Sequence, residues 1–213
     1  MAWQVAPHAR FCVASGRVIF LDIARDRYFA LPLDQSHAFQ AWIEGVPPAP
    51  VPPIIERLHR AGLVEAVERG APAFPMEILP ATCALAAAKV PPRLGSVLDV
   101  AFSFLRVRVA LKRRGLMQTL DWLRPTAEET SEDATLRHAA VFRSNRGALP
   151  MAVSCLPDSL AMLDYLGRRG VHASIVFGVT GTPFRAHCWV QLGDQVLNDV
   201  LDNITPFTPI LQR

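Results

Sequence analysis

The sequence predicts an α+β protein made of a small N-terminal domain and a larger C-terminal domain. Three observations support this. Short apolar stretches separated by turn residues fill the first third of the chain, a proline-rich segment follows at residues 68–93, and the second half shows helical patterns before alternating, strand-like ones. Helices followed by a run of strands are typical of α+β architecture. The chain has 213 residues, of which 51% are hydrophobic, so packed cores are expected and a mainly disordered protein is excluded.

The N-terminal part carries signals for three strands and two helices. The Ser15-Gly16 turn separates two stretches rich in β-branched and aromatic residues, which indicates a hairpin that a third strand extends. Two helical patterns follow, each with helix-stopping residues after it. The predicted strands are 11–14, 17–22 and 26–31, the predicted helices are 33–44 and 53–61, and residues 63–67 form a short strand or a turn.

Three strands with short helices match a small winged-helix-like domain, a type that often binds DNA. Here the second helix carries charges of mixed sign, at Glu56, Arg57 and Arg60, and no basic or aromatic recognition stripe. The net charge is only +3. A local basic cluster between Arg106 and Arg114 is expected to be a solvated helix face. The sequence therefore predicts no nucleic-acid partner.

We place the domain boundary near residue 75, with domains at 1–75 and 94–213 and a proline-rich linker at 76–93. After the linker come apolar helical patterns, a further helix that begins at a cysteine, and three alternating segments. The predicted helices are 94–123, 135–146 and one from Cys155 to about Gly170, and the predicted strands are 173–179, 184–192 and 195–201. The C-terminal domain is thus expected to pack helices on an antiparallel sheet.

Cys155 lies where turn residues give way to a helical pattern. Backbone N–H groups and the helix dipole at such a position favour the thiolate over the thiol. His187 and Asp199 follow on the next alternating segments. Taken singly, each residue is more often a core or surface residue than a catalytic one. The ordered trio on these element types, however, is the layout of a papain-like or transglutaminase-like site, with Cys155 as nucleophile and His187 as base.

The loop between the last two predicted strands decides which residue orients His187. A two-residue Gly193-Asp194 loop would pair His187 with Val200 and place Asn198, rather than Asp199, on its face. A three-residue loop or a bulge would oppose His187 to Asp199. A carboxylate stabilises imidazolium better than an amide does. We therefore predict Asp199, and with it an odd-length loop or a bulge between residues 192 and 196.

The second half of the sequence resembles a known family. The motifs that carry the resemblance are Cys155-Leu156 with Ser159-Leu160-Ala161, Gly178-Val179, Phe184-Arg185-Ala186-His187 with Trp189-Val190, and Val196-Leu197-Asn198-Asp199. They are similar to those of the leader peptidase of lasso-peptide biosynthesis, the B protein of that pathway. The resemblance implies a Cys-His-Asp cysteine endopeptidase that frees the core of a precursor peptide for an ATP-dependent cyclase resembling asparagine synthetase. Asp158, Cys188 and Gln191 depart from the family pattern, which affects substrate detail rather than chemistry.

The N-terminal hairpin with the segment that follows it resembles the precursor-recognition domain of peptide-modifying pathways. In that family an extended leader peptide adds a strand to the sheet edge. The third predicted strand would be that edge, and Tyr28, Phe29, Ala30 and Leu31 would form the docking surface. The alternative for each of these side chains is a place in the core.

The sequence is also compatible with two other functions, one enzymatic and one not. The same triad would serve a transglutaminase or acyltransferase if an amine resolved the acyl-enzyme, and a non-catalytic protein would only present a precursor peptide. The four cysteines show no metal-site spacing, so neither a metal nor a cofactor is predicted, and a reduced, cytoplasmic protein is expected. No signal peptide or membrane span is predicted.

Overall fold

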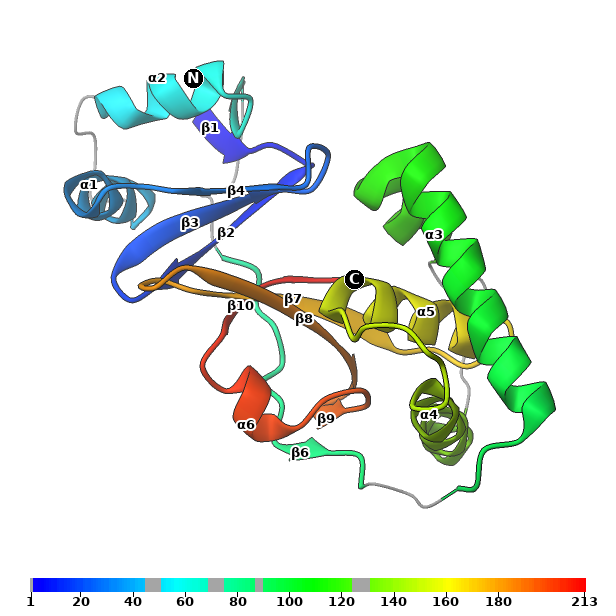
Figure 1. Cartoon of the computed structure of the whole chain (residues 1–213). Helices are drawn as coiled ribbons and strands as arrows, with labels where there is room; N and C mark the ends of the chain where they lie inside the picture. The colour runs from blue at the N-terminus through cyan, green and yellow to red at the C-terminus, as the bar shows by residue number, and fades with distance from the viewer. Residues whose placement is uncertain (1, 45–50, 69–74, 87–89, 124–130) are drawn as a thin grey trace.

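The computed structural model describes residues 2–44, 51–68, 75–86, 90–123 and 131–213 (Figure 1). Its N-terminal part contains β1 (Ala2–Val5), β2 (Ala9–Ala14), β3 (Arg17–Asp22), β4 (Arg27–Ala30), α1 (Leu33–Ile43), α2 (Pro53–Arg60) and β5 (Val64–Val67). The predicted antiparallel meander, β2-β3-β4, and both predicted helices are present. Ser15 and Gly16 adopt positive φ angles of 52° and 73°, as the tight β2–β3 turn requires. No sequence pattern predicted β1, which pairs with β5.

β3, the central strand of the β2-β3-β4 sheet, is buried on both faces. One face packs on α1 and α2 through an aromatic cluster in which the rings of Phe11 and Phe20 lie 5.3 and 5.4 Å from the ring of Phe39. On the opposite face Ile19 and Leu21, together with residues of β2, join the core of the C-terminal part. All five residues of β3 after Arg17 are therefore buried.

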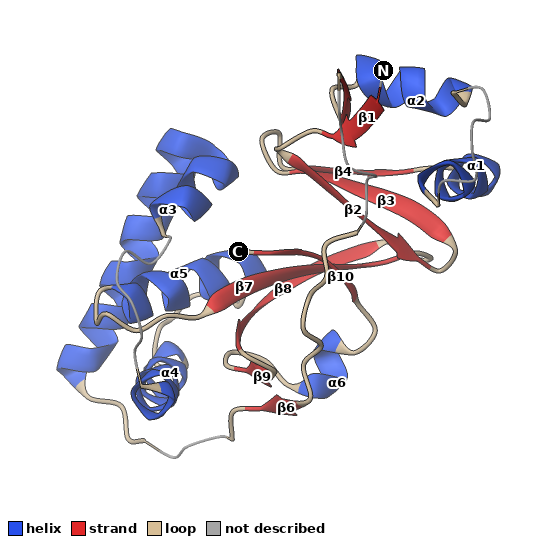
Figure 2. Ribbon diagram, turned by 180° about the vertical axis from the view of Figure 1, so that it is seen from behind, coloured by secondary structure: helices blue, strands red, loops and turns tan. Residues whose placement is uncertain are grey.

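The C-terminal part contains one helix, α5, that packs on a five-stranded sheet, and α3 and α4, which pack on that helix (Figure 2). Its elements are β6 (Cys83–Ala84), α3 (Leu94–Trp122), α4 (Glu132–Arg146), α5 (Cys155–Gly167), β7 (Ser174–Thr180), β8 (Arg185–Leu192), β9 (Gln195–Val196), α6 (Leu201–Ile204) and β10 (Thr208–Gln212). The sheet order is β10-β7-β8-β9-β6, antiparallel except for the β9–β6 pair. The α+β architecture is confirmed.

Three details differ from the sequence prediction. The strand predicted at 195–201 ends at Val196 and gives way to a bend and the short helix α6. The edge strands β6 and β10 had no separate signal, because each is short and lies beside prolines. The helix predicted at 94–123 is bent at Gly115, whose φ of 74° is not helical. Glycine tolerates that backbone conformation without the steric cost of a Cβ.

The two parts of the chain share one hydrophobic cluster. Cys12, Ile19 and Leu21 of the N-terminal sheet lie in the same cluster as buried residues of α3, α5, β7 and β8. The β7–β8 turn sits against the β2–β3 turn so closely that a Cβ on Gly181 would lie 2.5 Å from Ser15 Cβ. The predicted domain boundary at 75 follows residues 69–74, which lie outside the described residues. The division into two domains stays a prediction, and any two such domains share this hydrophobic cluster.

Within the described parts of the chain, no helix has the length and apolar character needed to cross a membrane.

Candidate active site

Cys155 is the first residue of α5, so its side chain lies at the end of the helix where backbone N–H groups are unpaired. The segment before it is held by Arg146 of α4, which forms an ion pair with Asp158 and also donates to the carbonyls of Met151 and Ala152. The second oxygen of Asp158 accepts the backbone N–H of Ser154 at 2.8 Å. One arginine and one aspartate thus fix the turn that presents Cys155.

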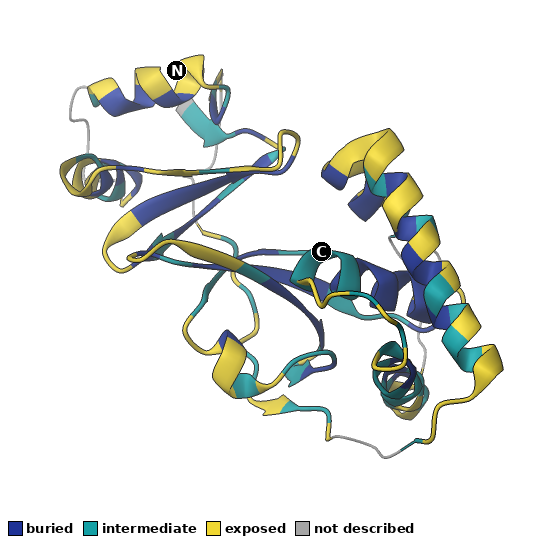
Figure 3. Ribbon diagram, in the orientation of Figure 1, coloured by how far each residue is buried: buried dark blue, intermediate teal, exposed yellow. Residues whose placement is uncertain are grey.

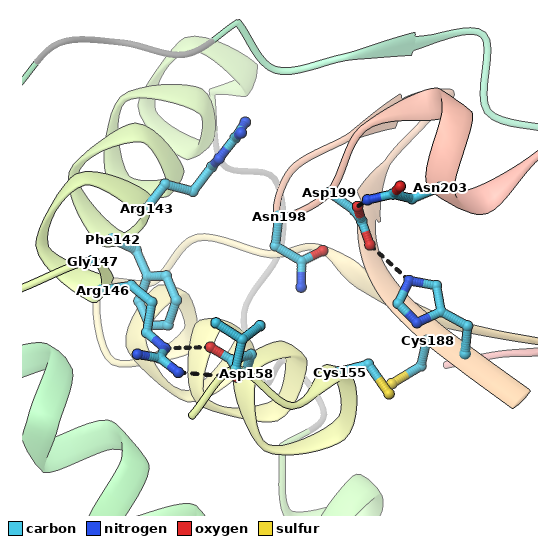
Figure 4. Close-up of a pocket in the computed structure, with 12 residues that line it drawn as sticks. Phe142, Arg143, Arg146, Gly147, Cys155, Asp158, Cys188, Asn198, Asp199 and Asn203 are labelled. Atoms are coloured by element: carbon cyan, nitrogen blue, oxygen red, sulfur yellow. Dashed lines mark hydrogen bonds and ion pairs between the residues drawn. The ribbon is translucent and has the colours of Figure 1, made fainter. Parts of the chain in front are cut away.

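His187 and Asp199 lie in direct contact. The distance between His187 Nε2 and Asp199 Oδ2 is 2.6 Å. The other carboxylate oxygen, Oδ1, accepts hydrogen bonds from the backbone N–H of Val200 and from the Asn203 side-chain amide, both at 2.8 Å. The carboxylate is therefore fixed on both oxygens (Figure 4). With Nε2 engaged, Nδ1 is the imidazole nitrogen left for the Cys155 thiol.

The loop that precedes Asp199 differs from the prediction. Leu192 pairs with Gln195 and Gln191 with Val196, so Gly193-Asp194 forms a regular two-residue hairpin loop. The predicted odd-length loop or bulge is wrong. Asp199 reaches His187 nevertheless, because β9 ends at Val196 and the alternation of faces ends with it. Asp199 is thus the residue that contacts His187, but the predicted loop geometry is not the cause of that contact.

Asn198 has a different set of partners. Its Oδ1 accepts the backbone N–H of Val190 at 2.7 Å, and its Nδ2 donates to Ser159 Oγ at 2.9 Å. Ser159 in turn donates to the carbonyl of Cys188 at 3.3 Å. The amide therefore ties the segment after β9 to both β8 and α5. Asn198 thus bridges these elements, and the residue that bonds to His187 is Asp199.

The charges of Cys155 and His187 favour an ion pair. A hydrogen bond from the Cys188 thiol, then one from His187, lowers the pKa of Cys155 to about 4 despite its partial burial. The hydrogen bond to Asp199, followed by the one to Cys155, raises the pKa of His187 to about 9. Cys188 itself stays a thiol, since its hydrogen bond to Cys155 and its burial raise its pKa far above the ordinary value. At neutral pH the site therefore holds a thiolate beside an imidazolium.

Burial raises the pKa of Asp199, but the hydrogen bonds from His187, Asn203 and the Val200 N–H outweigh burial and leave it below the ordinary value. The imidazole ring is also packed on one side. The ring centroid of Phe207 lies 5.2 Å from that of His187, and that of Trp189 lies 6.1 Å away. Gly178, which pairs with His187 across β7 and β8, makes room for both rings. A Cβ there would lie 2.9 Å from Phe207 Cβ.

A pocket of about 440 Å³ opens onto these groups. Cys155, His187, Cys188 and Asp199 line one wall, and side chains of α4 line another (Figure 4). The residues from α4 are Phe142, Arg143 and Arg146. A thiol, an imidazole and its carboxylate partner thus share an open pocket, and these are groups that acyl transfer can use.

The model of the transglutaminase-like superfamily matches residues 98–212, which is more than half of the chain. The chain belongs to this superfamily. It is also 30% identical over 91 residues to the microcin J25-processing protein McjB of Escherichia coli, a match that covers 43% of this chain and 39% of that protein. The matched region is thus about two fifths of the length of the curated relative. No solved structure matches the chain.

Four groups of the site were assigned no role from the sequence, although Gly178 and Cys188 stood among the motif residues. Cys188 and Asn203 contact the thiol and the carboxylate, respectively, while Phe207 and Gly178 set the position of the imidazole ring. Asn203 follows Asp199 at a spacing of four, the spacing of one helical turn, but α6 is too short to be recognised from its sequence.

The residues expected to bind a leader peptide lie on β4 or directly after it. β4 is an edge strand of its sheet, as predicted. Phe29 and Ala30 are exposed. Leu31 is not part of that surface, because its side chain is fully buried in the core with Phe11 and Phe20. The prediction that Leu31 contacts a ligand is therefore corrected.

Tyr28 connects β4 to the transglutaminase-like part. Its ring centroid lies 5.5 Å from that of Phe184, just before the histidine strand. Burial is the largest cause of a pKa above the ordinary value for tyrosine, and the nearby Asp26 carboxylate and Cys155 thiolate raise the pKa further. The edge strand and the thiol are thus near neighbours in space.

Proposed function

We propose that the protein is a cysteine endopeptidase that binds a ribosomally made lasso-peptide precursor and removes its leader. The observation that carries the proposal is the Cys155 thiolate at the start of α5 beside a His187 that is bonded to Asp199. Membership of the transglutaminase-like superfamily and the similarity to a microcin-processing protein support it.

In the proposed reaction the Cys155 sulfur attacks the scissile carbonyl, and the backbone N–H of Cys155 stabilises the oxyanion. His187 donates its Nδ1 proton to the leaving amine, which becomes the new N-terminus of the core peptide. The leader remains as a thioester on Cys155. Neutral His187 then takes a proton from water, the hydroxide attacks the thioester, and the leader leaves with a free carboxylate while Cys155 returns to thiolate. Asp199 holds the ring in place throughout.

The leader would add a strand to the free edge of β4, with Tyr28, Phe29 and Ala30 as the nearest side chains. Because Tyr28 lies near the thiol, a leader on this edge would direct the residues that follow it toward the pocket. The freed core would pass to an ATP-dependent cyclase resembling asparagine synthetase. The precursor and this cyclase are the proposed partners.

The test is incubation of the purified protein with the precursor peptide encoded beside its gene, with and without the cyclase, followed by intact-mass analysis. We expect two fragments, leader and core, whose masses sum to that of the precursor plus one water. Cys155→Ala should abolish cleavage. Cys83→Ala, which removes an exposed thiol on β6, is the matched control and should cleave normally.

Two outcomes would replace the proposal. A product that joins the leader acyl group to an amine would make the protein an acyltransferase with the same triad. Full cleavage by Cys155→Ala would mean that the protein presents the precursor to another enzyme.

A further inference from the structure

α3 carries apolar side chains on two opposite faces. Val100, Phe104 and Val107 are buried against the rest of the C-terminal part. Five large apolar side chains lie on the other face, with 41 to 76% of their surface exposed: Leu94, Leu98, Phe102, Leu105 and Val109. Their spacing of four, four, three and four residues places them in one stripe along the helix. Figure 3 shows exposed residues along the outer side of α3.

Cations flank this stripe on both sides. The carboxylate of Asp99, beside Arg106 on one border, is ion-paired with Arg168 and Arg169, and Arg106 itself is ion-paired with Asp164. At 100° per residue, Arg108 and Lys112 project along one border and Arg106 and Arg113 along the other. The sequence from Val100 to Leu120 contains five basic residues and no acidic one. The chain as a whole carries +3, so the remainder of it is net negative. Positive charge is therefore concentrated on this helix.

The bend at Gly115 adds a tryptophan to the same face. It turns the last part of α3 back, so that the Trp122 ring lies 4.9 Å from the Arg106 guanidinium carbon and 5.7 Å from that of Arg114. A groove of about 400 Å³ lies between the parts of α3 before and after the bend. It is lined by Phe102 and Val109 together with Arg106, Arg113 and Arg114. Tryptophan and arginine are the side chains that settle at the boundary between lipid headgroups and acyl chains.

We propose that this face of α3 binds the surface of an acidic phospholipid bilayer, with the helix lying in the plane of the interface. An exposed apolar stripe bordered mainly by cations is the pattern of an interfacial amphipathic helix. Transfer of the apolar side chains from water to the acyl boundary lowers the free energy, and the flanking cations attract anionic headgroups. Phosphates enter the arginine-lined groove at the bend.

Other occupants fit this face less well. A second copy of the chain would oppose five cations to five cations. A nucleic acid would pair with the cations but leave the leucines in water. An acidic protein groove is the remaining rival, and the experiment separates it from a lipid surface because the vesicles contain no protein. The proposal does not depend on the peptidase activity.

The experiment is co-sedimentation of the full-length protein with vesicles of phosphatidylcholine alone and of phosphatidylcholine with 30% phosphatidylglycerol. We expect binding to the acidic vesicles, little binding to the neutral ones, and loss of binding in high salt. Leu98→Gln with Leu105→Gln should abolish binding. Arg108→Gln with Lys112→Gln should weaken it about tenfold or more.

The matched controls remove a similarly exposed leucine, or the same number of positive charges, at positions outside α3. Leu79→Gln removes an exposed leucine from another segment, and Arg17→Gln with Arg60→Gln removes two exposed cations from the N-terminal part. Both should bind acidic vesicles as the unaltered protein does. Circular dichroism checks that every variant is folded. Absence of binding to acidic vesicles, equal binding to neutral ones, or equal weakening by the Arg17 and Arg60 changes would overturn the proposal.

Discussion

The acidity of the Cys155 thiol comes from neighbours on separate elements. α5 supplies the helix start, β8 supplies Cys188 and His187, and the segment after β9 supplies Asp199. The thiolate accepts hydrogen bonds from the side chain and the backbone N–H of Cys188 as well as from His187. Cys188 thus donates a hydrogen bond to the Cys155 thiolate and stays protonated, because its own pKa is raised.

The first prediction concerns the pH dependence of precursor cleavage. The ion pair of Cys155 thiolate and His187 imidazolium, which the proposed reaction uses, exists above the Cys155 pKa of about 4 and below the His187 pKa of about 9. Protonation of the thiolate below the first value, or loss of the imidazolium proton above the second, removes it. We therefore expect kcat/KM to be level between these limits and to fall about tenfold per pH unit outside them.

Asp199→Asn should move the basic limb of this profile to lower pH, because the hydrogen bond to Asp199 is the largest cause of the raised His187 pKa. Asn198→Ala is the control. It loses the bridge to Val190 and Ser159 but leaves the carboxylate, so its basic limb should stay near 9. A basic limb that Asp199→Asn does not move would contradict the assignment.

The second prediction tests Cys188. Cys188→Ala removes the largest cause of the low Cys155 pKa, so the pKa should rise and the thiolate fraction at acidic pH should fall. Iodoacetamide labelling of Cys155, followed by peptide mass spectrometry from pH 4 to 8, measures this. Cys12→Ala alters a buried thiol whose pKa burial raises to about 12, and it should leave the profile unchanged. Identical profiles for all three proteins would remove Cys188 from the site.

Among the elements, the helix that begins at Cys155 and the strand that carries His187 were predicted from the sequence, because both have strong periodic patterns. The sequence could not predict the path from β9 to Asp199. Facing residues follow from strand register only while the strand continues. Here the Asn198 side chain accepts the Val190 N–H that a longer β9 would have paired with, and the strand ends. The Asn198 side chain thus takes the place of a backbone acceptor of β9, and an alternating pattern of apolar and polar residues does not indicate such a replacement.

The third prediction concerns the β7–β8 pair. Gly178→Ala places a methyl group 2.9 Å from Phe207 Cβ and 3.0 Å from the Trp189 ring, so the rings beside His187 have to move. We expect kcat to fall at least tenfold with the fold retained, since small displacements of a catalytic group have large effects on rate. Gly167→Ala, at the end of α5, has no atom within 4 Å of the added methyl and is the matched control. Normal turnover in both variants would show that the packing around His187 is not tight.

At the scale of the whole molecule, β3 shows why two domains in the sequence share a core in the structure. Its Val18-Ile19-Phe20-Leu21 run is continuously apolar, a pattern typical of strands buried on both faces. A free-standing meander would alternate apolar and polar residues. The second buried face was therefore visible in the sequence, but its partner was not, because the elements that cover it begin some 75 residues later.

The last prediction follows from that shared core. Phe20 and Leu21 are both fully buried but point to opposite faces of β3, toward the N-terminal helices and toward the C-terminal part. Phe20→Ala should lower the free energy of unfolding by about 3–5 kcal/mol and Leu21→Ala by about 2–5 kcal/mol. If the shared core makes the chain one cooperative unit, either change should shift the unfolding of both halves to the same lower urea concentration. Hydrogen exchange of peptides from β2–β3 and from α5, followed across a urea series, measures the two halves separately. A Phe20→Ala protein in which β2–β3 exchanges early while α5 keeps the urea midpoint of the unaltered protein would show that the halves unfold independently.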